Sequence, residues 1–474
     1  RWEEREGEGE AAPVEAAEGR RPTLTPEQAA ALEALRAALG EAAPRPVLLH
    51  GVTGSGKTEV YLRLAEGVVA AGRQALILVP EIGLTPQVAA AFAGRFAGRV
   101  AIQHSGLAPG ARRAQWRAIA AGRVPVVVGT RSAVFAPLER LGLVVVDEEH
   151  DPAYKQAEAP RYHGRDLAIL RGVRAGALVV LGSATPSLES LHHARRGRYR
   201  RVVMRARATG RRLPPVHLVD MRTAPCRGLF SVRLLKAMEE RLARGEQTLL
   251  FLNRRGYARA VQCTACGEAI GCPHCATALT YHRVDGTGRC HLCGYRATPS
   301  VACPACGAAR LQLAGAGTQK VEERLHRLFP TARVVRMDRD TTRRTGAHRE
   351  LLDHMHAGRA DILLGTQIVT KGHHLGRLTL VGVLLGDAAL QVPDFRAAER
   401  CFQLLSQVAG RCGREGPGEV LIQTYQPESP VLRAVAAHDY DRFADHELAT
   451  REALRLPPFG HLVLLAAEAA AEAE

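Results

Sequence analysis

Hydrophobic residues along the chain gather in short, almost wholly apolar runs that alternate with stretches of helical spacing. Between residue 24 and about residue 208 the runs are VLLHG, QALILVP, VAIQH, VPVVVGT, LGLVVVDEE and GALVVLGSAT. Runs that are apolar on both faces are typical of strands in a parallel sheet with helices on each side. The pattern therefore predicts an α/β lobe built on a parallel sheet.

A second set of apolar runs extends from about residue 230 to 425 and predicts a second lobe of similar size. Its runs are QTLLFLN, ARVVRMD, ADILLGT, LTLVGVLLGD and GEVLIQT. After the first of them comes a cysteine-dense stretch without hydrophobic periodicity. The expected fold class is α/β, with two parallel-sheet lobes and a cysteine-rich insertion in the second lobe.

These shifts in pattern also suggest domain boundaries. We expect an acidic, disordered linker at 1–22, an ATP-binding first lobe at 23–208, a second lobe at 209–262 and 307–428, a double zinc-binding module at 263–306, and the start of a truncated C-terminal domain at 429–474. The opening residues lack the apolar core of a signal peptide, and no run is long enough to span a membrane. The expected location is the cytoplasm.

The first run leads into a glycine-rich turn, HGVTGSGKT, which a helical segment follows. Its spacing matches the phosphate loop, in which backbone N–H groups and a helix N-terminus surround a polyphosphate. Lys57 can reach the outer phosphates, and the Thr58 hydroxyl can bind Mg²⁺. The alternative is a chance glycine turn. The predicted ATP-binding residues here are Gly51, Thr53, Gly54, Ser55, Gly56, Lys57 and Thr58.

Carboxylates end the run LVVVDEEH, at the edge where such sheets bind ligands. Asp147 is suited to hold Mg²⁺ through water, and Glu148 to polarise the attacking water. By itself an acidic strand end is weak evidence. Together with the phosphate loop it predicts a site for phosphoryl transfer.

Phosphoryl transfer also needs positive charge on the transition state, often from an arginine of another lobe. The segment QVAGRCGR supplies Arg411 and Arg414, three residues apart. If the lobes close on ATP, both guanidinium groups are expected at the γ-phosphate. A solvated basic turn is the alternative, because the chain is rich in arginine.

Eight of the eleven cysteines form four CxxC pairs, and two such pairs complete a tetrahedral Zn²⁺ site. Disulfides are the alternative, but a chain without a secretion signal meets reducing thiols. We expect two Zn²⁺ ions; His274, His282 and His291 could substitute as ligands. Cys226, Cys401 and Cys412 are expected to be buried. The predicted ligands are Cys263, Cys266, Cys272, Cys275, Cys290, Cys293, Cys303 and Cys306.

The formal net charge is +16 and the pI is about 9.8, which favours a polyanionic partner such as nucleic acid. A merely arginine-rich enzyme is the alternative. Segments 129–132 and 365–367 follow strands and could hold phosphates, and 182–185 could relay nucleotide state. Aromatic and basic side chains interleave just after DEEH, which suits base stacking, although a plain surface loop would look alike: Tyr154, Lys155, Arg161, Tyr162 and His163.

In this order the motifs resemble those of superfamily 2 helicases, which implies two RecA-like P-loop lobes with parallel sheets. The cysteine-rich, zinc-binding insertion would lie in the second lobe. In detail the chain is similar to the PriA family of primosomal replication-restart helicases, over about residues 23 to 460. The resemblance is carried by GVTGSGKTEVY, LVPEIGLTPQ, GTRSAVFAPL, DEEHDPAYKQ, LGSATPSLE, FLNRRGY, the eight cysteines, GTQKVEE, TKGHH, DFRAAER and QVAGRCGR.

This resemblance implies an ATP-dependent 3′→5′ DNA helicase that acts at stalled or recombined forks in the bacterial cytoplasm, at the nucleoid. Implied partners are single-stranded and forked DNA, primosome and replicative-helicase loading proteins, and single-stranded DNA-binding protein, with no membrane. Two alternatives stay open. One is a zinc-bearing DNA-binding scaffold that recruits replication proteins, and the other is a helicase acting on RNA.

The resemblance also implies roles for single residues. Gln28, in LTPEQ, corresponds to an adenine-side glutamine, and Arg411 and Arg414 correspond to a sensor and an arginine finger. It further implies how the cysteines pair, which spacing alone leaves open. The outer site would take Cys263, Cys266, Cys303 and Cys306, and the inner site Cys272, Cys275, Cys290 and Cys293.

Overall fold

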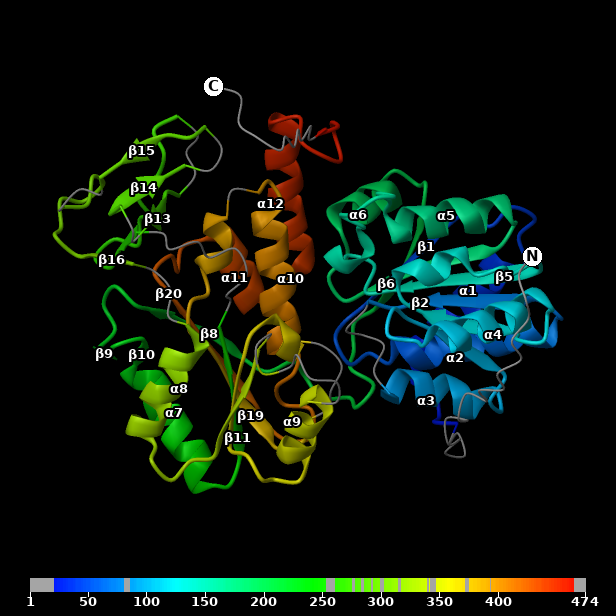
Figure 1. Cartoon of the computed structure of the whole chain (residues 1–474), viewed down its shortest axis with the longest axis horizontal. Coiled ribbons are helices and arrows are strands. Elements are labelled where there is room, and N and C mark those ends of the chain that lie inside the picture. The colour runs from blue at the N-terminus through cyan, green and yellow to red at the C-terminus, as the bar shows by residue number, and fades with distance from the viewer. Residues whose placement is uncertain are drawn as a thin grey trace.

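The computed structural model of the chain forms two α/β lobes side by side (Figure 1). The strands of the cysteine-rich module lie at the end of the second lobe that faces away from the first. The residues that the structure describes are 21–80, 86–252, 261–274, 278–282, 285–290, 293–298, 302–313, 317–338, 341, 347–370, 375–392 and 394–463. The predicted linker at 1–22 therefore lies almost wholly outside them.

The first lobe is built on a seven-stranded sheet in which every strand pair is parallel. All six predicted strands are present, and β7 is an edge strand that the sequence pattern did not reveal. In spatial order the strands are β3 (Val100–Gln103), β4 (Val126–Gly129), β2 (Gln74–Leu78), β5 (Leu141–Asp147), β6 (Leu178–Ser183), β1 (Val47–Gly51) and β7 (Arg200–Met204).

Helices cover both faces of this sheet, as continuous apolar strands require. Three helices pack on the face that carries Val47 and Leu49: α1 (Pro26–Leu39), α2 (Lys57–Ala70) and α3 (Pro86–Arg95). The face with Leu48 is covered by α4 (Pro109–Ala120) and α5 (Gly164–Arg174). None of the helices in the described ranges combines the length and the apolar character needed to cross a bilayer.

The second lobe has a six-stranded sheet, again parallel throughout. All five predicted strands are present, and the edge strand β8 was missed. In spatial order the strands are β17 (Val334–Met337), β18 (Ile362–Gly365), β11 (Gln247–Phe251), β19 (Leu378–Val383), β20 (Glu419–Thr424) and β8 (Val216–Asp220). A two-stranded hairpin of β9 (Cys226–Arg227) and β10 (Phe230–Ser231) precedes α7. The predicted α/β class with two parallel-sheet lobes is confirmed.

Two apolar cores hold the helices of the second lobe to its sheet. One of them also takes in Leu188 and Leu191 of α6 (Leu188–Arg195), a helix of the first lobe, so the lobes share apolar packing. The remaining helices are α7 (Val232–Ala243), α8 (Thr318–Leu328), α9 (Ala347–His356), α10 (Ala397–Ala409), α11 (Pro430–Ala436) and α12 (Tyr440–Ala453).

The cysteine-rich module is inserted between β11 and α8 and is closed at its base by a short antiparallel pair, β12 (Val261–Cys263) and β16 (Leu311–Leu313). Farther out lies a three-stranded antiparallel sheet of β13 (Thr280–His282), β14 (Thr287–Arg289) and β15 (Arg296–Ala297). This small sheet buries few apolar side chains, chiefly Leu279 beside Cys272 and Cys290. Bound metal would supply the stability that so small a core lacks.

Candidate nucleotide site and cysteine clusters

The phosphate loop joins β1 to α2 and depends on glycine at two points. Gly54 and Gly56 have φ angles of 82° and 81°, which L side chains rarely adopt. At Gly56 a side chain would also collide with Gln28, because a Cβ there would lie 2.2 Å from Gln28 Nε2. The loop can therefore close tightly only with glycine at these positions.

Gln28 links the start of α1 to the phosphate loop. Its side-chain oxygen accepts a hydrogen bond from Thr25 N–H at 2.9 Å, completing a capping box, and its Nε2 donates to the Ser55 carbonyl at 2.9 Å. Gln28 is thus buried against the loop and held by both ends of its amide. This places it beside the proposed phosphate site.

Two groups of the loop fit an incoming polyphosphate. Lys57 is 8% exposed, and its Nζ donates to the Gly51 carbonyl at 2.8 Å, so the ammonium lies over the loop. The buried hydroxyl of Ser55 has no hydrogen-bond partner among the described residues. Because Gly56 precedes α2 directly, the free N–H groups of the helix N-terminus also face this loop.

Asp147 ends β5 next to the phosphate loop. It accepts a hydrogen bond from the Tyr61 hydroxyl of α2 at 3.0 Å. Burial, and then the negative charge of Glu148, raises the pKa of Asp147 to about 6, although the charge of Lys57 opposes the shift. The side chain therefore lies close to both Glu148 and Lys57. Tyr61 ends the motif GVTGSGKTEVY, but no role was predicted for it.

Glu148 adopts a φ of 45°, uncommon for a residue with a side chain. Its buried Oε2 has no hydrogen-bond partner among the described residues and lies 3.6 Å from His150 Nδ1. Strained backbone and an uncompensated buried carboxylate oxygen both cost stability, and such features cluster at functional sites.

Glu149 has a structural place instead. It is fully buried, accepts hydrogen bonds from the Ser187 N–H and from the Ser187 and Ser190 hydroxyls, and pairs with Arg165 at 3.0 Å. These contacts tie the end of β5 to the start of α6. Of the three carboxylates in the motif, only Asp147 and Glu148 are therefore available for the predicted nucleotide site.

The segment 410–414 of the second lobe, called the arginine loop here, lies against the phosphate loop. A Cβ at Gly410 would lie 2.7 Å from the Cβ of Thr53, so the two loops are in direct contact. Burial and the charge of Arg414 lower the pKa of Arg411 to about 9, against the opposing charge of Glu148. The structure thus brings Arg411, Arg414, Glu148 and the phosphate loop together.

Hydrogen bonds cross the lobe interface beside this contact. Gln407 Nε2 on α10 donates to His150 Nε2 at 2.8 Å, which places the ring proton on Nδ1, 2.7 Å from Ser183 Oγ. The Thr185 N–H donates to the same Ser183 oxygen at 2.9 Å. A continuous chain of hydrogen bonds therefore joins α10 to the acidic strand end and to the turn that follows β6.

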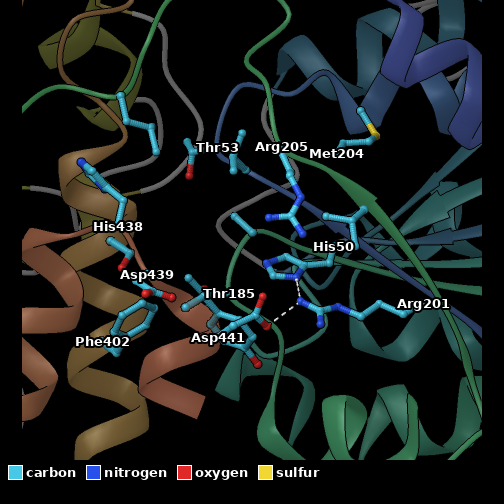
Figure 2. Close-up of a pocket in the computed structure, with 16 residues that line it drawn as sticks. His50, Thr53, Thr185, Arg201, Met204, Arg205, Phe402, His438, Asp439 and Asp441 are labelled. Carbon is cyan, nitrogen blue, oxygen red and sulfur yellow. Dashed lines mark hydrogen bonds and ion pairs between the residues drawn. The ribbon is translucent and has the colours of Figure 1, made fainter. Parts of the chain in front are cut away.

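A cavity of about 260 Å³ lies between the lobes and is lined in part by Val52 and Thr53 of the phosphate loop (Figure 2). Its wall includes Thr53 and Thr185 from the first lobe and Phe402 from α10. Arg201 crosses the cavity, donating to His50 Nδ1 and to Asp441 of α12, each at 2.8 Å. The helices after the second sheet therefore also contact the first lobe.

The segment after β5 that was predicted to contact nucleic acid packs against Arg131, in the turn after β4. Tyr154 is 0% exposed and donates its hydroxyl to the Asp147 carbonyl, so its predicted role in base stacking is wrong. Tyr162 is partly exposed and packs edge-on against Phe135, which is 51% exposed and was not predicted. Arg131 donates to the carbonyls of Ala153 and Lys155, so it fastens the loop after β5.

Four cysteines form a cluster at the base of the module. The sulfur atoms of Cys263, Cys266, Cys303 and Cys306 all lie within 4.8 Å of one another. The Cys263–Cys306 and Cys266–Cys303 sulfur distances are both 3.7 Å. Tetrahedral Zn–S bonds of about 2.3 Å place sulfur atoms about 3.8 Å apart, so the cluster fits zinc.

The second cluster contains Cys272, Cys290 and Cys293, whose sulfur atoms also lie within 4.8 Å of one another. The distance between Cys272 Sγ and Cys293 Sγ is 3.6 Å. The fourth predicted ligand, Cys275, lies outside the described residues. Neither cluster in the described part of the module includes a histidine, and the His274 ring packs edge-on against Tyr295.

Three cysteines stand outside the clusters. Cys401 and Cys412 are buried as predicted, whereas Cys226 is exposed on the β9–β10 hairpin, where the prediction was wrong. The module itself is fastened to the second lobe through Gln262, whose Nε2 donates to buried Asp387 at 3.3 Å. Gly267 packs against the Tyr425 carbonyl so closely that a Cβ there would lie 2.4 Å away.

Family models and solved structures match this chain as follows. The DEAD/DEAH box helicase model matches residues 25–194, and the model of the PriA DNA helicase Cys-rich region (CRR) domain matches residues 272–297. The structure of RecG bound to a three-way DNA junction aligns with a TM-score of 0.53 at 19% identity, over 90% of this chain and 47% of that one. The DUF1998 helicase MrfA bound to DNA aligns with a TM-score of 0.52 at 15% identity, over 91% of this chain and 50% of that one. These structures support the fold alone.

The fold and the matches define the class as a protein of two parallel-sheet lobes, the first of which matches the DEAD/DEAH box helicase model. Replication restart protein PriA of Bacillus subtilis (strain 168) is 49% identical over 446 residues, which are 93% of this chain and 55% of that protein. Replication restart protein PriA of Rickettsia conorii (strain ATCC VR-613 / Malish 7) is 38% identical over 434 residues, which are 91% of this chain and 67% of that protein. The chain belongs to the PriA family. It spans little more than half the length of the Bacillus relative.

Proposed function

We propose that this chain hydrolyses ATP in the cleft between its lobes and uses the hydrolysis to separate DNA strands. Lys57 and the backbone of the phosphate loop would hold the phosphates, with Gln28 on the adenine side. Thr58 and Asp147 would hold Mg²⁺, which when bound neutralises phosphate charge. Glu148 would orient the attacking water, and Arg411 and Arg414 would stabilise the γ-phosphate as it leaves.

The contact between Gly410 and Thr53 is the single observation that supports this proposal most. It brings the arginine loop of one lobe against the phosphate loop of the other, where neither lobe alone holds both parts of a phosphoryl-transfer site. The opposing charge of Glu148 on Arg411 supports the same arrangement. Hydrolysis would then separate or reseat the two loops, and that motion would move the lobes along a bound strand.

We infer DNA as the substrate and replication restart as the process. The family relationship and the net charge of +16 support both. The same proposal includes movement in the 3′→5′ direction and action on forked DNA. The proposed protein partners are primosome and helicase-loading proteins and single-stranded DNA-binding protein. The proposed location is the bacterial cytoplasm, at the nucleoid. The alternative is a zinc-bearing DNA-binding scaffold in which hydrolysis is incidental.

Glu148→Gln separates the helicase from the scaffold. The amide keeps the shape of the side chain but cannot polarise water, so we expect ATP turnover to fall about 100-fold or more. Binding of ATP and of single-stranded DNA should stay, because Lys57 and every basic side chain of the chain are unchanged. Turnover, DNA binding and unwinding of a forked duplex are the measurements.

The matched control is Glu239→Gln on α7, an exposed glutamate far from the motif, which should behave as the wild type. Loss of unwinding with intact DNA binding supports the helicase. A Glu148→Gln chain that still unwinds DNA at the wild-type rate would refute the proposed role of Glu148.

We further propose that the two cysteine clusters each hold one Zn²⁺ ion, Cys275 completing the second. Metal analysis of the purified chain should give two zinc ions per chain. Cys263→Ser and Cys272→Ser should each lower that number to one, because three thiolates hold the ion less tightly than four. Cys226→Ser, at an exposed cysteine outside both clusters, is the control and should leave two. A wild-type chain that carries one ion or none would overturn the two-site assignment.

A further inference from the structure

The segment that leaves the first sheet runs along the phosphate loop before it reaches the second lobe. Met204 accepts a hydrogen bond at its carbonyl from Val52 N–H at 3.0 Å, and Ala208 N–H donates to the Gly54 carbonyl at 2.9 Å. Between them Ala206 N–H donates to Glu27 Oε2 at 2.8 Å. We call residues 204–208 the strap. Its backbone is tied to the phosphate loop at both ends and to α1 in the middle.

One side chain of the strap reaches across to the second lobe. Arg207 is 4% exposed, although arginine is rarely buried so completely. Its Nη1 donates to the carbonyls of Gly413 at 3.0 Å and Cys412 at 3.3 Å, and its Nη2 donates to the carbonyl of Gly410 at 3.1 Å. All of these acceptors are backbone carbonyls of the arginine loop.

The charge of Arg207 suits this position. Gly410 is the C-cap of α10, and the carbonyls that follow a helix C-terminus carry partial negative charge that attracts a cation. The fork of the guanidinium can bond several such carbonyls at once. The stem of Arg207 passes close to Gly54, since a Cβ at Gly54 would lie 3.7 Å from Arg207 Cγ. One residue thus touches both loops of the candidate site.

This position also has an electrostatic cost, because Arg207 lies close to another arginine. Burial lowers the pKa of Arg414, and the positive charge of Arg207 lowers it further. The two guanidinium groups therefore repel each other. A residue that served only to hold the lobes together could do so without adding a third positive charge here. The hydrogen bonds to the loop carbonyls compensate for this repulsion and at the same time fix the path of the loop backbone.

We propose that Arg207 is a positioning residue, which couples the phosphate loop to the arginine loop through the strap. Because the strap backbone is bonded to the phosphate loop, any shift of that loop on nucleotide binding moves Arg207. Arg207 then carries the backbone of residues 410–413, and with it Arg411, toward the γ-phosphate. This inference rests on the proposed function, in which Arg411 acts on the γ-phosphate.

The test compares Arg207→Ala and Arg207→Lys with the control Arg211→Ala, an exposed arginine of the same connecting segment. For Arg207→Ala, kcat of DNA-stimulated ATP turnover should fall about tenfold or more, the effect of losing hydrogen bonds made by a charged group. Affinity for a fluorescent ADP analogue should stay within about twofold of wild type, because the phosphate loop itself is intact. Lysine should restore part of kcat, since an ammonium can still bond one or two carbonyls.

A second measurement does not depend on hydrolysis. Amide hydrogen exchange of residues 410–414 should be faster in Arg207→Ala than in wild type and unchanged in Arg211→Ala. An Arg207→Ala chain with wild-type kcat and wild-type exchange in the arginine loop would overturn the inference. So would an equal loss of ADP affinity and kcat, which would point to general damage of the phosphate loop. A wild-type chain without ATP turnover would refute the proposed function, while the exchange rates would still decide the role of Arg207.

Discussion

Replacing Arg411 by alanine should lower DNA-stimulated ATP turnover by about 1,000-fold, the low end of what an arginine at a phosphoryl-transfer site contributes. The reason is geometric. Arg411 follows Gly410, which touches Thr53 of the phosphate loop, and its guanidinium feels the charge of Glu148. In a cleft closed to water, a positive charge at that position stabilises the charge that develops as the phosphate transfers.

The control for Arg411 is Arg324→Ala, an exposed arginine of α8 in the same lobe. It removes one positive charge from the second lobe without touching the cleft, and it should keep wild-type turnover. Steady-state turnover with saturating single-stranded DNA is the measurement. A drop of the same size in both variants would mean that the loss does not depend on the position of the arginine, and it would exclude a role for Arg411 at the phosphate.

Lys57→Ala is the second large effect that we expect, a fall in turnover of at least about 100-fold. In the structure the ammonium of Lys57 is held over the loop by the Gly51 carbonyl, within reach of any phosphate that the loop binds. Alanine leaves the helix N-terminus and the backbone N–H groups in place, so some nucleotide binding should remain. Strand separation should be lost together with turnover.

The chain offers a matched control for Lys57 among its few lysines. Lys236 lies exposed on α7 of the second lobe, and Lys236→Ala should leave turnover unchanged. Both variants lose the same charge, so a difference between them isolates the position. If Lys57→Ala turned over ATP like the wild type, the phosphate loop would not be the site of hydrolysis.

The interior of both sheets could be predicted because its strands are apolar on both faces. All or nearly all residues of β1, β5 and β18 are buried. A short run of consecutive apolar residues is typical of a strand inside a parallel sheet that is covered on both faces. The edge strands β7 and β8 were missed because they are only partly buried: Arg200 and Arg201 begin β7, and only two of the five residues of β8, Val216 and Val219, are buried. Their pairing depends on a neighbouring strand far along the chain.

The site shows the same division. Motifs whose residues are consecutive, such as the phosphate loop and the CxxC pairs, carry their chemistry in local spacing. Contacts between distant residues leave no such trace. Arg207 is one of 64 lysines and arginines, and nothing near it in sequence marks it as the residue that reaches the arginine loop. Tyr154 has the composition of an exposed stacking residue, yet tertiary packing buries it beneath Asp147.

The cysteine-rich module is attached to the lobe that carries the arginine loop. Its base is hydrogen-bonded to Asp387, which follows β19, and packs at Gly267 against Tyr425, which follows β20. Both strands belong to the sheet that also supports α10 and the arginine loop. The cysteine-rich module is therefore attached to the same sheet that carries α10 and the arginine loop.

The most direct test of a nucleotide site formed by both lobes is the affinity of the chain for ADP with fluoroaluminate. Fluoroaluminate mimics the phosphate during its transfer. Wild type should bind this complex far more tightly than ADP alone, as transition-state analogues are bound. Arg411→Ala should bind ADP like the wild type but lose most of the additional affinity for the fluoroaluminate complex. If Arg411→Ala kept all of that additional affinity, the arginine loop would not reach the phosphate, and a shared site between the lobes would be ruled out.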